Sequence, residues 1–450
     1  MAGVVGRTAR TLTTATVEIL HGITRRPPPS GAKVLLEYVS ANPNGPITAI
    51  HGRGGVLGDT LAALLAATGS DPTREFYVND ANSFRQMRQF ARAVLHRYRQ
   101  MFGQESWNGS ALPVDAEGYP EEYVTHTTQK LIEAVGDRFL GRNDDETLLP
   151  LQETTARIIR QEQEEDLTAL GIRFDRWFSE SRLHADGAIE RILESLRASG
   201  HTFEQGSALW LRSTDFGDEA DRVLLRADGS PTYLAGDLAY HADKFDRGFD
   251  YLIDLWASDH AGYIERTRAG LAALGYDPKK LTVLLVGPVR LLRDGTEVKA
   301  MRTDGLLEVI TLTELLTELS PEVVRWTLCD ASSEEPLDLD ADRLRRPDMP
   351  ASLEKVRYAR SSCRWAAENA GDAVDPEVFS ELTKYPEVLR EAADRLTPNR
   401  LTAYLAELSD RWVDSVRSGN RPAEPVTQAV TAVLDQGSKL LGIDIKDDNA

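Results

Sequence analysis

The turn that follows the apolar run at residues 34–39 combines the residue types that binding of an anion requires. The run is short and of the strand type, and Pro43, Gly45 and Pro46 follow it. His51 then opens a stretch, reaching residue 68, in which the apolar residues have helical spacing. A histidine at the positive end of a helix dipole can donate a hydrogen bond to an anionic oxygen. The sequence therefore predicts a strand, a tight turn and a helix whose N-terminus can hold a phosphate.

The pattern on both sides of this turn predicts alternating strands and helices. Further runs of the strand type lie at residues 76–78, 209–211, 223–225, 251–253 and 283–286. Helical patterns cover most of residues 83–103, 120–195 and 262–276, and everything after about residue 350. Alternation of this kind is typical of an α/β fold with a parallel sheet, whereas a purely helical tail is typical of a helix bundle.

Composition and charge exclude several classes of protein. Of the 450 residues, 41% are hydrophobic and 27% are charged, as in an ordinary soluble protein. No apolar run reaches the roughly 18 residues of a membrane span, and the N-terminus lacks a signal peptide, so we expect no membrane partner. Cys329 and Cys363 are too few for a disulfide framework, which predicts buried thiols in the reducing cytoplasm. The net charge of −19 disfavours sequence-blind binding to a polyanion but does not exclude a local basic groove.

The sequence gives no sign of a resident metal or prosthetic group. The histidines outside the turn have no metal-ligand spacing; they are His21, His96, His126, His184, His201, His241 and His260. There is also no Gly-x-Gly-x-x-Gly fingerprint and no Walker loop. We therefore predict no metal site and no bound cofactor.

A series of motifs in the same order along the chain resembles the arginyl-tRNA synthetase family. They lie at residues 38–46, 51–54, 58–59, 74–80, 118–123, 216–241 and 337–340, and in the tail at residues 356–360, 398–401 and 440–443. The resemblance spans about residues 34–445 and implies a class I synthetase, which activates arginine with ATP and Mg²⁺ and transfers it to tRNA. It also implies a Rossmann-type catalytic domain with a helical connective insertion, followed by an all-α bundle similar to an anticodon-binding domain.

The resemblance suggests three parts of the chain. Residues 1–33 are a lead-in that ends in a proline-rich linker, residues 34–348 are the catalytic domain with its insertion at about 85–205, and residues 349–450 are the helical domain. The family usually has an additional N-terminal domain that contacts tRNA. Because only a short lead-in precedes the first strand, we expect a diverged paralogue that lacks this domain.

The positions that match the family's arginine site are intact. They are Asn42, Glu180, Tyr233 and Asp237. The chemistry suits the substrate, because a guanidinium presents five N–H donors in one plane and pairs with carboxylates in a defined geometry. Tyr233 and Asp237 are four residues apart, which places them on one face of a helix.

The positions that match the family's nucleotide site are altered. The His-x-Gly-His signature reads Thr48-Ala49-Ile50-His51, the Lys-Met-Ser-Lys signature reads Lys299-Ala300-Met301-Arg302, and Gly-x-Asp-His reads Ala257-Ser258-Asp259-His260. In the family, the glycine replaced by Ile50 leaves a flat surface for adenine, where a β-branched side chain would intrude. The resemblance still assigns Thr48, Ile50, His51, Asp259, His260, Lys299 and Arg302 to the nucleotide. Of these, Thr48, His51, Lys299 and Arg302 would stabilise charge on the reacting phosphate.

Three functions remain open from the sequence. The first is a ligase that activates L-arginine with ATP and transfers it to tRNA or to a small amine in a specialised pathway. The second is a transferase that uses arginyl-tRNA without ATP, and the third is a non-catalytic arginine-binding paralogue. Asp410–Ser415 stand where the family has aromatic residues that read the anticodon, so we expect tRNA binding to be weakened. The sequence does not indicate the acceptor, the pathway or the oligomeric state.

Overall fold

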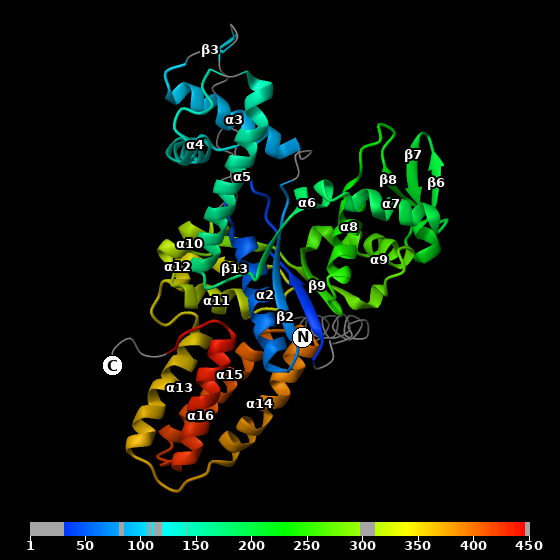
Figure 1. The fold of residues 1–450 in the computed structure, drawn as a ribbon. Helices are drawn as coiled ribbons and strands as arrows, with labels where there is room; N and C mark the ends of the chain where they lie inside the picture. The colour runs from blue at the N-terminus through cyan, green and yellow to red at the C-terminus, as the bar shows by residue number, and fades with distance from the viewer. Residues whose placement is uncertain are drawn as a thin grey trace, which may run out of the picture.

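A five-stranded parallel sheet lies at the centre of the molecule (Figure 1). The computed structural model describes residues 31–80, 85–104, 106–107, 110–111, 119–141, 143–297 and 311–445. The strands are β1 (Lys33–Glu37), β2 (Asp71–Val78), β5 (Arg176–Ser179), β9 (Tyr251–Ala257) and β10 (Leu281–Val286), in the order β10-β9-β1-β2-β5. All four pairings are parallel. The predicted α/β class with a parallel sheet is therefore confirmed.

The central strand β1 is buried on both faces, which explains why it is an apolar run without alternation. Val34 and Leu36 of β1 join one hydrophobic cluster with helix α2 (Ala49–Ala67), while Leu35 joins another cluster with helix α8 (Tyr233–Asp246). A parallel strand covered on both faces has no polar side to show in its sequence. Helix α9 (Ile264–Ala273) packs beside α8 and contributes to the second cluster.

Helices inserted between β2 and β5 form a unit with its own core. They are α3 (Arg85–Met101), α4 (Glu121–Val135) and α5 (Asp144–Ala169), with the two short strands β3 (Ser106–Trp107) and β4 (Ser110–Ala111). The expectation that residues 120–195 are mostly helical missed β5. This strand is only four residues long, and it pairs at the sheet edge, where Trp177 stacks on Phe76 at 4.2 Å between ring centroids. Such a short edge strand is too brief to show a period of its own.

The strands expected at residues 209–211 and 223–225 exist, but they do not join the parallel sheet. They are β7 (Ala208–Leu211) and β8 (Arg222–Leu225), which form an antiparallel sheet with β6 (Thr202–Gln205). Gly206 and Ser207 have φ of 61° and 63° between β6 and β7. Positive φ at both central residues is the hallmark of the two-residue hairpin turn, which forces antiparallel pairing. Helices α6 (Glu180–Ala185) and α7 (Ala188–Ala198) and the turn η1 (Ser213–Phe216) complete this region.

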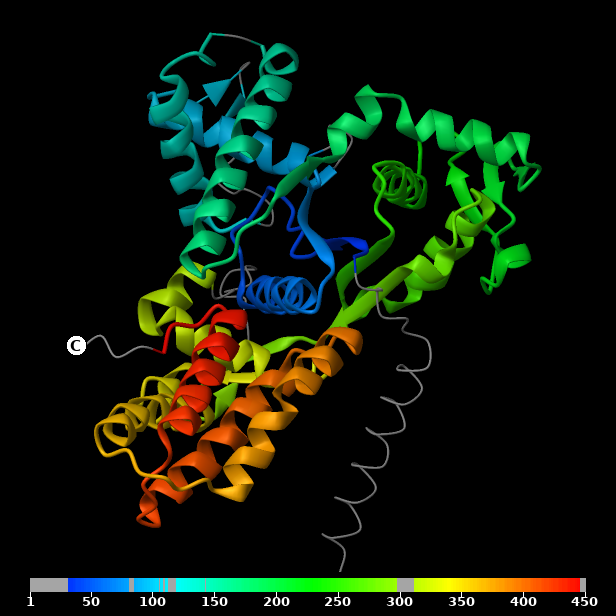
Figure 2. The same ribbon diagram turned by 60° about the horizontal axis from the view of Figure 1, so that its bottom comes forward.

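The remaining elements lead to a helical tail. After β10 come β11 (Val289–Arg293), β12 (Thr296–Glu297), α10 (Leu312–Glu318), α11 (Pro321–Cys329), β13 (Leu337–Asp340) and α12 (Ala341–Leu344). The tail contains α13 (Ala351–Glu368), α14 (Pro376–Asp394), α15 (Asn399–Arg417) and α16 (Glu424–Leu440). In two views, these helices, the insertion helices and the α6–α9 region surround the sheet as three separate groups (Figures 1 and 2). The expected helical tail is therefore present.

Two further sequence expectations concern burial. Cys329 in α11 and Cys363 in α13 are both buried free thiols, as their helical patterns predicted. Among the residues that the structure describes, no helix is both long enough and apolar enough to cross a bilayer.

Arg325 of α11 joins the sheet region to the end of the tail. Its buried guanidinium donates to the backbone oxygen of Leu441 at 2.7 Å, to that of Leu170 at 3.0 Å and to the carboxylate of Asp59 at 2.7 Å. Leu441 directly follows α16, Leu170 lies at the end of α5, and Asp59 belongs to α2. One side chain therefore fixes the first helix of the α/β unit, the insertion and the helical tail relative to one another.

The substitution Arg325→Met should lower the free energy of unfolding by about 3 kcal/mol, because Asp59 and two backbone oxygens lose a buried donor. The measurement is urea denaturation followed by circular dichroism. Arg182→Met is the control, since Arg182 pairs with Asp186 on the surface and should change stability by less than about 1 kcal/mol. Equal unfolding midpoints for the two variants would show that Arg325 does not join these parts.

Candidate functional site

The strand order reverses between β1 and β9, at the carboxyl ends of these strands. The chain runs from β1 to β2 on one side, whereas β9 and β10 lie on the other side. Open α/β sheets bind ligands at such a switch point. The loop after β1 leads from this edge of the sheet to the start of α2, and Asp237 near the start of α8 lies beside Tyr77 at the end of β2. The predicted site residues that the structure describes lie on these and the neighbouring elements.

The backbone directly after β1 is held in an unusual conformation. Val39 and Ser40 have φ of 70° and 43°, in the left-handed region that a β-branched residue rarely adopts. Ser40 Oγ donates to Glu37 Oε1 at 2.8 Å and accepts from the backbone N–H of Tyr77 at 3.2 Å. These contacts hold the strained turn in place, and strain of this kind is often found at functional sites.

Asn42, a predicted arginine ligand, is fixed on two sides. Its Oδ1 accepts from Asn79 Nδ2 at 3.1 Å, and its backbone oxygen accepts from Gln163 Nε2 at 3.0 Å. Gln163 of α5 also donates to the backbone oxygen of Gly45 at 2.8 Å. The loop after β1 is thus fixed between the end of β2 and the insertion.

Glu180 and Asp237 both lie beside the phenol of Tyr77. Glu180 begins α6 directly after β5, and it accepts a hydrogen bond from the Tyr77 hydroxyl. Burial, and then the charges of Glu180 and Asp237, raise the pKa of Tyr77 well above its ordinary value. Asp237 is one turn into α8, where burial raises its pKa to about 6. The structure therefore brings these two predicted arginine ligands together around a residue that was not predicted.

Tyr233 is the first residue of α8, one turn before Asp237. Its side chain is 64% exposed. The sequence placed Tyr233 and Asp237 on one helical face, and both do belong to the start of this helix.

Thr48 and His51 close the N-terminus of α2 with a mutual hydrogen bond. The backbone N–H of Thr48 donates to His51 Nδ1 at 3.2 Å, so this ring nitrogen is the acceptor and the proton belongs on Nε2. Burial lowers the pKa of His51 to about 4, which leaves the imidazole neutral at physiological pH. A neutral imidazole with a proton on Nε2 can donate to an anionic oxygen at this helix end.

Ile50 lies in the same first turn of α2 and is 42% exposed. Asp259 and His260 follow β9 in the turn η2 (Ser258–Tyr263), and both are exposed, with 4.0 Å between Asp259 Oδ2 and His260 Nε2.

Lys299 and Arg302 lie outside the described residues. Thr311, which follows them, bridges to Thr48, and Leu312 donates its N–H to the backbone oxygen of Ile47 at 2.7 Å.

Four polar residues beside the predicted site were missed, since no local pattern shows that they come together. They are Tyr77, Glu37, Lys244 and Asp254. The last three form a buried ionic cluster with His241 beneath Asp237. A lone acidic residue in the apolar run of β9 was the available signal, since buried charges require partners.

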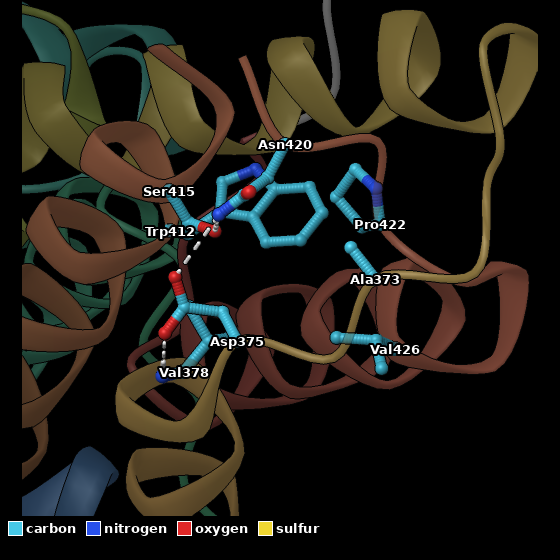
Figure 3. Close-up of a pocket in the computed structure, with 8 residues that line it drawn as sticks. All are labelled: Ala373, Asp375, Val378, Trp412, Ser415, Asn420, Pro422 and Val426. Atoms are coloured by element: carbon cyan, nitrogen blue, oxygen red, sulfur yellow. Dashed lines mark hydrogen bonds between the residues drawn. The ribbon is translucent and has the colours of Figure 1, made fainter. Parts of the chain in front are cut away.

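A small hollow in the helical tail contains none of the predicted site residues (Figure 3). Asn420 Nδ2 donates to Asp375 Oδ2 at 3.4 Å and to Ser415 Oγ at 3.1 Å, beside the ring of Trp412. Asp375 also caps the N-terminus of α14. These mutual contacts indicate a structural role, in which the loop before α16 is held against α14 and α15.

No group of three or more histidine, cysteine or acidic side chains suited to a metal ion occurs among the residues that the structure describes.

Comparisons with known proteins agree with the motifs. The family model described as the catalytic domain of class I tRNA synthetases (R) matches residues 20–325. An arginine–tRNA ligase of Syntrophotalea carbinolica is 36% identical, over 92% of this chain and 78% of the relative, and one of Geobacillus thermodenitrificans is 38% identical, over 84% and 69%.

The fold has a counterpart among solved structures. Thermus thermophilus arginyl-tRNA synthetase superposes with a TM-score of 0.69 at 20% identity, over 96% of this chain and 85% of that one. Its fold includes a C-terminal helical region like that of α13–α16. The chain therefore belongs to the arginyl-tRNA synthetase family, a class I family of enzymes with a Rossmann-type catalytic domain.

Proposed function

We propose that the chain is a ligase that activates L-arginine with ATP and Mg²⁺ as an arginyl-adenylate and transfers the arginyl group to an acceptor. The observation that carries this proposal is the pair of carboxylates, Glu180 and Asp237, gathered around Tyr77. The names of the relatives support tRNA as the acceptor. A small amine of a specialised pathway is the other acceptor that the same chemistry would serve.

The carboxylates account for the choice of amino acid. A guanidinium is planar and always charged, and it pairs best with carboxylates that accept two N–H bonds side by side. Glu180 and Asp237 supply these acceptors, while Asn42 and Tyr233 supply neutral polar groups at the margin of the pocket. An ammonium side chain, with its charge at a single point, would satisfy this arrangement less well.

Activation requires stabilisation of charge at the nucleotide. The carboxylate of arginine attacks the α-phosphorus of ATP, the bond to the β,γ-phosphates breaks, and pyrophosphate leaves. The Nε2 proton of His51 donates to the α-phosphate oxygens at the end of α2. The Thr48 hydroxyl, with Oγ1 3.0 Å from His51 Nδ1, holds the ring in this tautomer. Lys299 and Arg302 supply positive charge for the departing pyrophosphate, and Asp259 and His260 contact the nucleoside. The acceptor then attacks the arginyl carbonyl, and AMP leaves.

The deciding experiment is arginine-dependent exchange of pyrophosphate into ATP, run with and without tRNA. Exchange without tRNA is expected for a ligase with its own choice of acceptor, and exchange only with tRNA for an arginyl-tRNA synthetase. Absence of exchange in both arms would overturn the proposal.

One observation favours a second function. Ile50 is exposed at the position where the family has a flat surface for adenine. A transferase that takes arginine from arginyl-tRNA would not need that surface. Binding of arginyl-tRNA without any exchange of pyrophosphate would indicate this transferase, and arginine binding alone would indicate a non-catalytic paralogue.

Asp237→Asn should lower arginine affinity by about a hundredfold, since a buried charge-assisted pair is lost. In the wild type, affinity should fall by up to about tenfold per pH unit below pH 6, because protonated Asp237 cannot pair with the guanidinium. Calorimetric titration between pH 5 and 8 measures both effects.

The matched control is Asp246→Asn, on the same helix, where the carboxylate binds Tyr276 at 2.8 Å. It should bind arginine as the wild type does and show the same decline below pH 6. Retention of full affinity in Asp237→Asn would remove Asp237 from the pocket.

His51 should remain a neutral imidazole with its proton on Nε2 down to about pH 5, because burial lowers its pKa to about 4. Nitrogen chemical shifts of histidine-labelled protein measure the tautomer, and His51→Gln identifies the signal. In urea-unfolded protein the same signal should titrate near pH 6.5. A folded-state midpoint near that value, or a proton on Nδ1, would contradict the assigned donor.

A further inference from the structure

A buried ionic cluster lies directly beneath the proposed arginine pocket. Lys244 Nζ is 2.6 Å from Glu37 Oε2 and 2.9 Å from Asp254 Oδ1, and the lysine and Asp254 are fully buried. Glu37 and Asp254 are register partners on the neighbouring parallel strands β1 and β9. Their side chains therefore share one face of the sheet, and the ammonium from α8 neutralises two carboxylates that would otherwise repel each other.

His241 completes the cluster. Its Nε2 lies 2.8 Å from Asp254 Oδ2, and its Nδ1 lies 2.7 Å from the backbone oxygen of Asp237. Both partners are acceptors, so both ring nitrogens must donate and the ring is an imidazolium in this arrangement. Two carboxylates and two cations then form a closed group with no net charge.

This group is connected to the pocket at two points on different elements. Through His241, it holds the backbone of α8 at Asp237. Through Glu37, it holds Ser40, whose hydroxyl also receives the N–H of Tyr77 and which lies two residues before Asn42. The same cluster therefore supports both the helix that carries the pocket carboxylate and the loop that carries the pocket amide.

We propose that Lys244 is a positioning residue for arginine: it fixes Asp237 and the Asn42 loop relative to each other, and it sets the charge of the pocket without touching the substrate. The inference rests on the proposed arginine site. A substrate cation binds well only if its carboxylate partners are ionised, and a buried ammonium nearby favours the ionised state.

The groups around Lys244 determine what its loss would do. Glu37 faces it from β1, Asp254 from β9, and His241 and Asp237 from its own helix; the ring of Tyr240 lies 4.3 Å from Nζ. Beyond this ring, Glu75 of β2 accepts from Tyr240 and is already paired with Arg247. Without the ammonium, three carboxylates would face one imidazolium, and one of them would retain a proton to higher pH.

The test uses three variants of the full chain, Lys244→Met, Glu37→Gln/Lys244→Met and the control Lys355→Met, whose lysine pairs with Asp410 on the surface. Arginine binding is measured by calorimetry between pH 5 and 8. Lys244→Met should bind arginine about tenfold to a hundredfold more weakly at pH 7, as for other supporting partners of a ligand site. The pH at which its affinity declines should move upward from the wild-type value, because the pocket carboxylates compete for a proton.

The double variant distinguishes a role in charge from a role in packing. Glutamine at position 37 keeps an oxygen for Ser40 and removes one carboxylate, which restores the charge balance. It should recover arginine affinity and the wild-type pH profile, whereas a packing defect would not be repaired.

Each outcome of this test supports or overturns the inference, except one that bears on the proposed function itself. Unchanged affinity and pH profile in Lys244→Met, or a folded double variant that binds no better than the single one, would overturn the inference. If Lys244→Met does not fold, the double variant decides alone: binding like the wild type supports the inference, and folded protein without binding overturns it. Absence of arginine binding by the wild type would instead refute the proposed function.

Discussion

Two carboxylates at register-matched positions of adjacent buried strands, Glu37 and Asp254, impose a condition that the surrounding structure must meet. Ionised carboxylates on one face of a buried sheet repel each other and lose their hydration, and burial alone raises the pKa of Glu37. Although burial opposes it, Lys244 and His241 hold the pKa of Asp254 below its usual range. Helix α8 must therefore pack against the sheet in the one position that brings Lys244 and His241 to Glu37 and Asp254. This packing also fixes the position of the first turn of α8.

The same condition extends to the loop after β1. Glu37 is the last residue of its strand, and its second oxygen receives Ser40, which adopts a left-handed conformation to reach it. This hydrogen bond directs the chain towards β2, where the backbone N–H of Tyr77 donates to the Ser40 hydroxyl. The strain of two non-glycine residues is thus offset by bonds to a carboxylate that is already fixed. The start of the proposed site is consequently as rigid as the sheet beneath it.

Sequence reasoning reached the parts of this arrangement that depend on long patterns. Four of the predicted strands are present as β1, β2, β9 and β10, and the predicted helix after His51 is present as α2. Buried strands leave a strong signal because their sequences are runs of apolar residues. These runs lie at residues 34–39, 76–78, 251–253 and 283–286. β5 was not predicted because it is an edge strand of only four residues. The strands at 209–211 and 223–225 belong to another, antiparallel sheet, which begins with a hairpin turn. The roles of Asn42, Glu180, Tyr233 and Asp237 stay predictions, made from motifs. The ionic cluster escaped because its members come from three elements, and only the register of β1 and β9 brings them together.

The division of the site between elements explains how one half can change while the other is retained. Glu180, Asp237 and Asn42 are each tied to the buried network or to the end of β2, so a substitution there would leave buried polar partners unsatisfied. Ile50 and Ala257, two of the altered residues, lie in the exposed first turn of α2 and at the exposed end of β9, where a larger side chain displaces only solvent. Substitution at Ile50 and Ala257 is therefore nearly neutral for folding, whereas substitution at the proposed arginine positions is not. Alteration at these two nucleotide positions beside unaltered proposed arginine positions is thus compatible with the fold at little cost in stability.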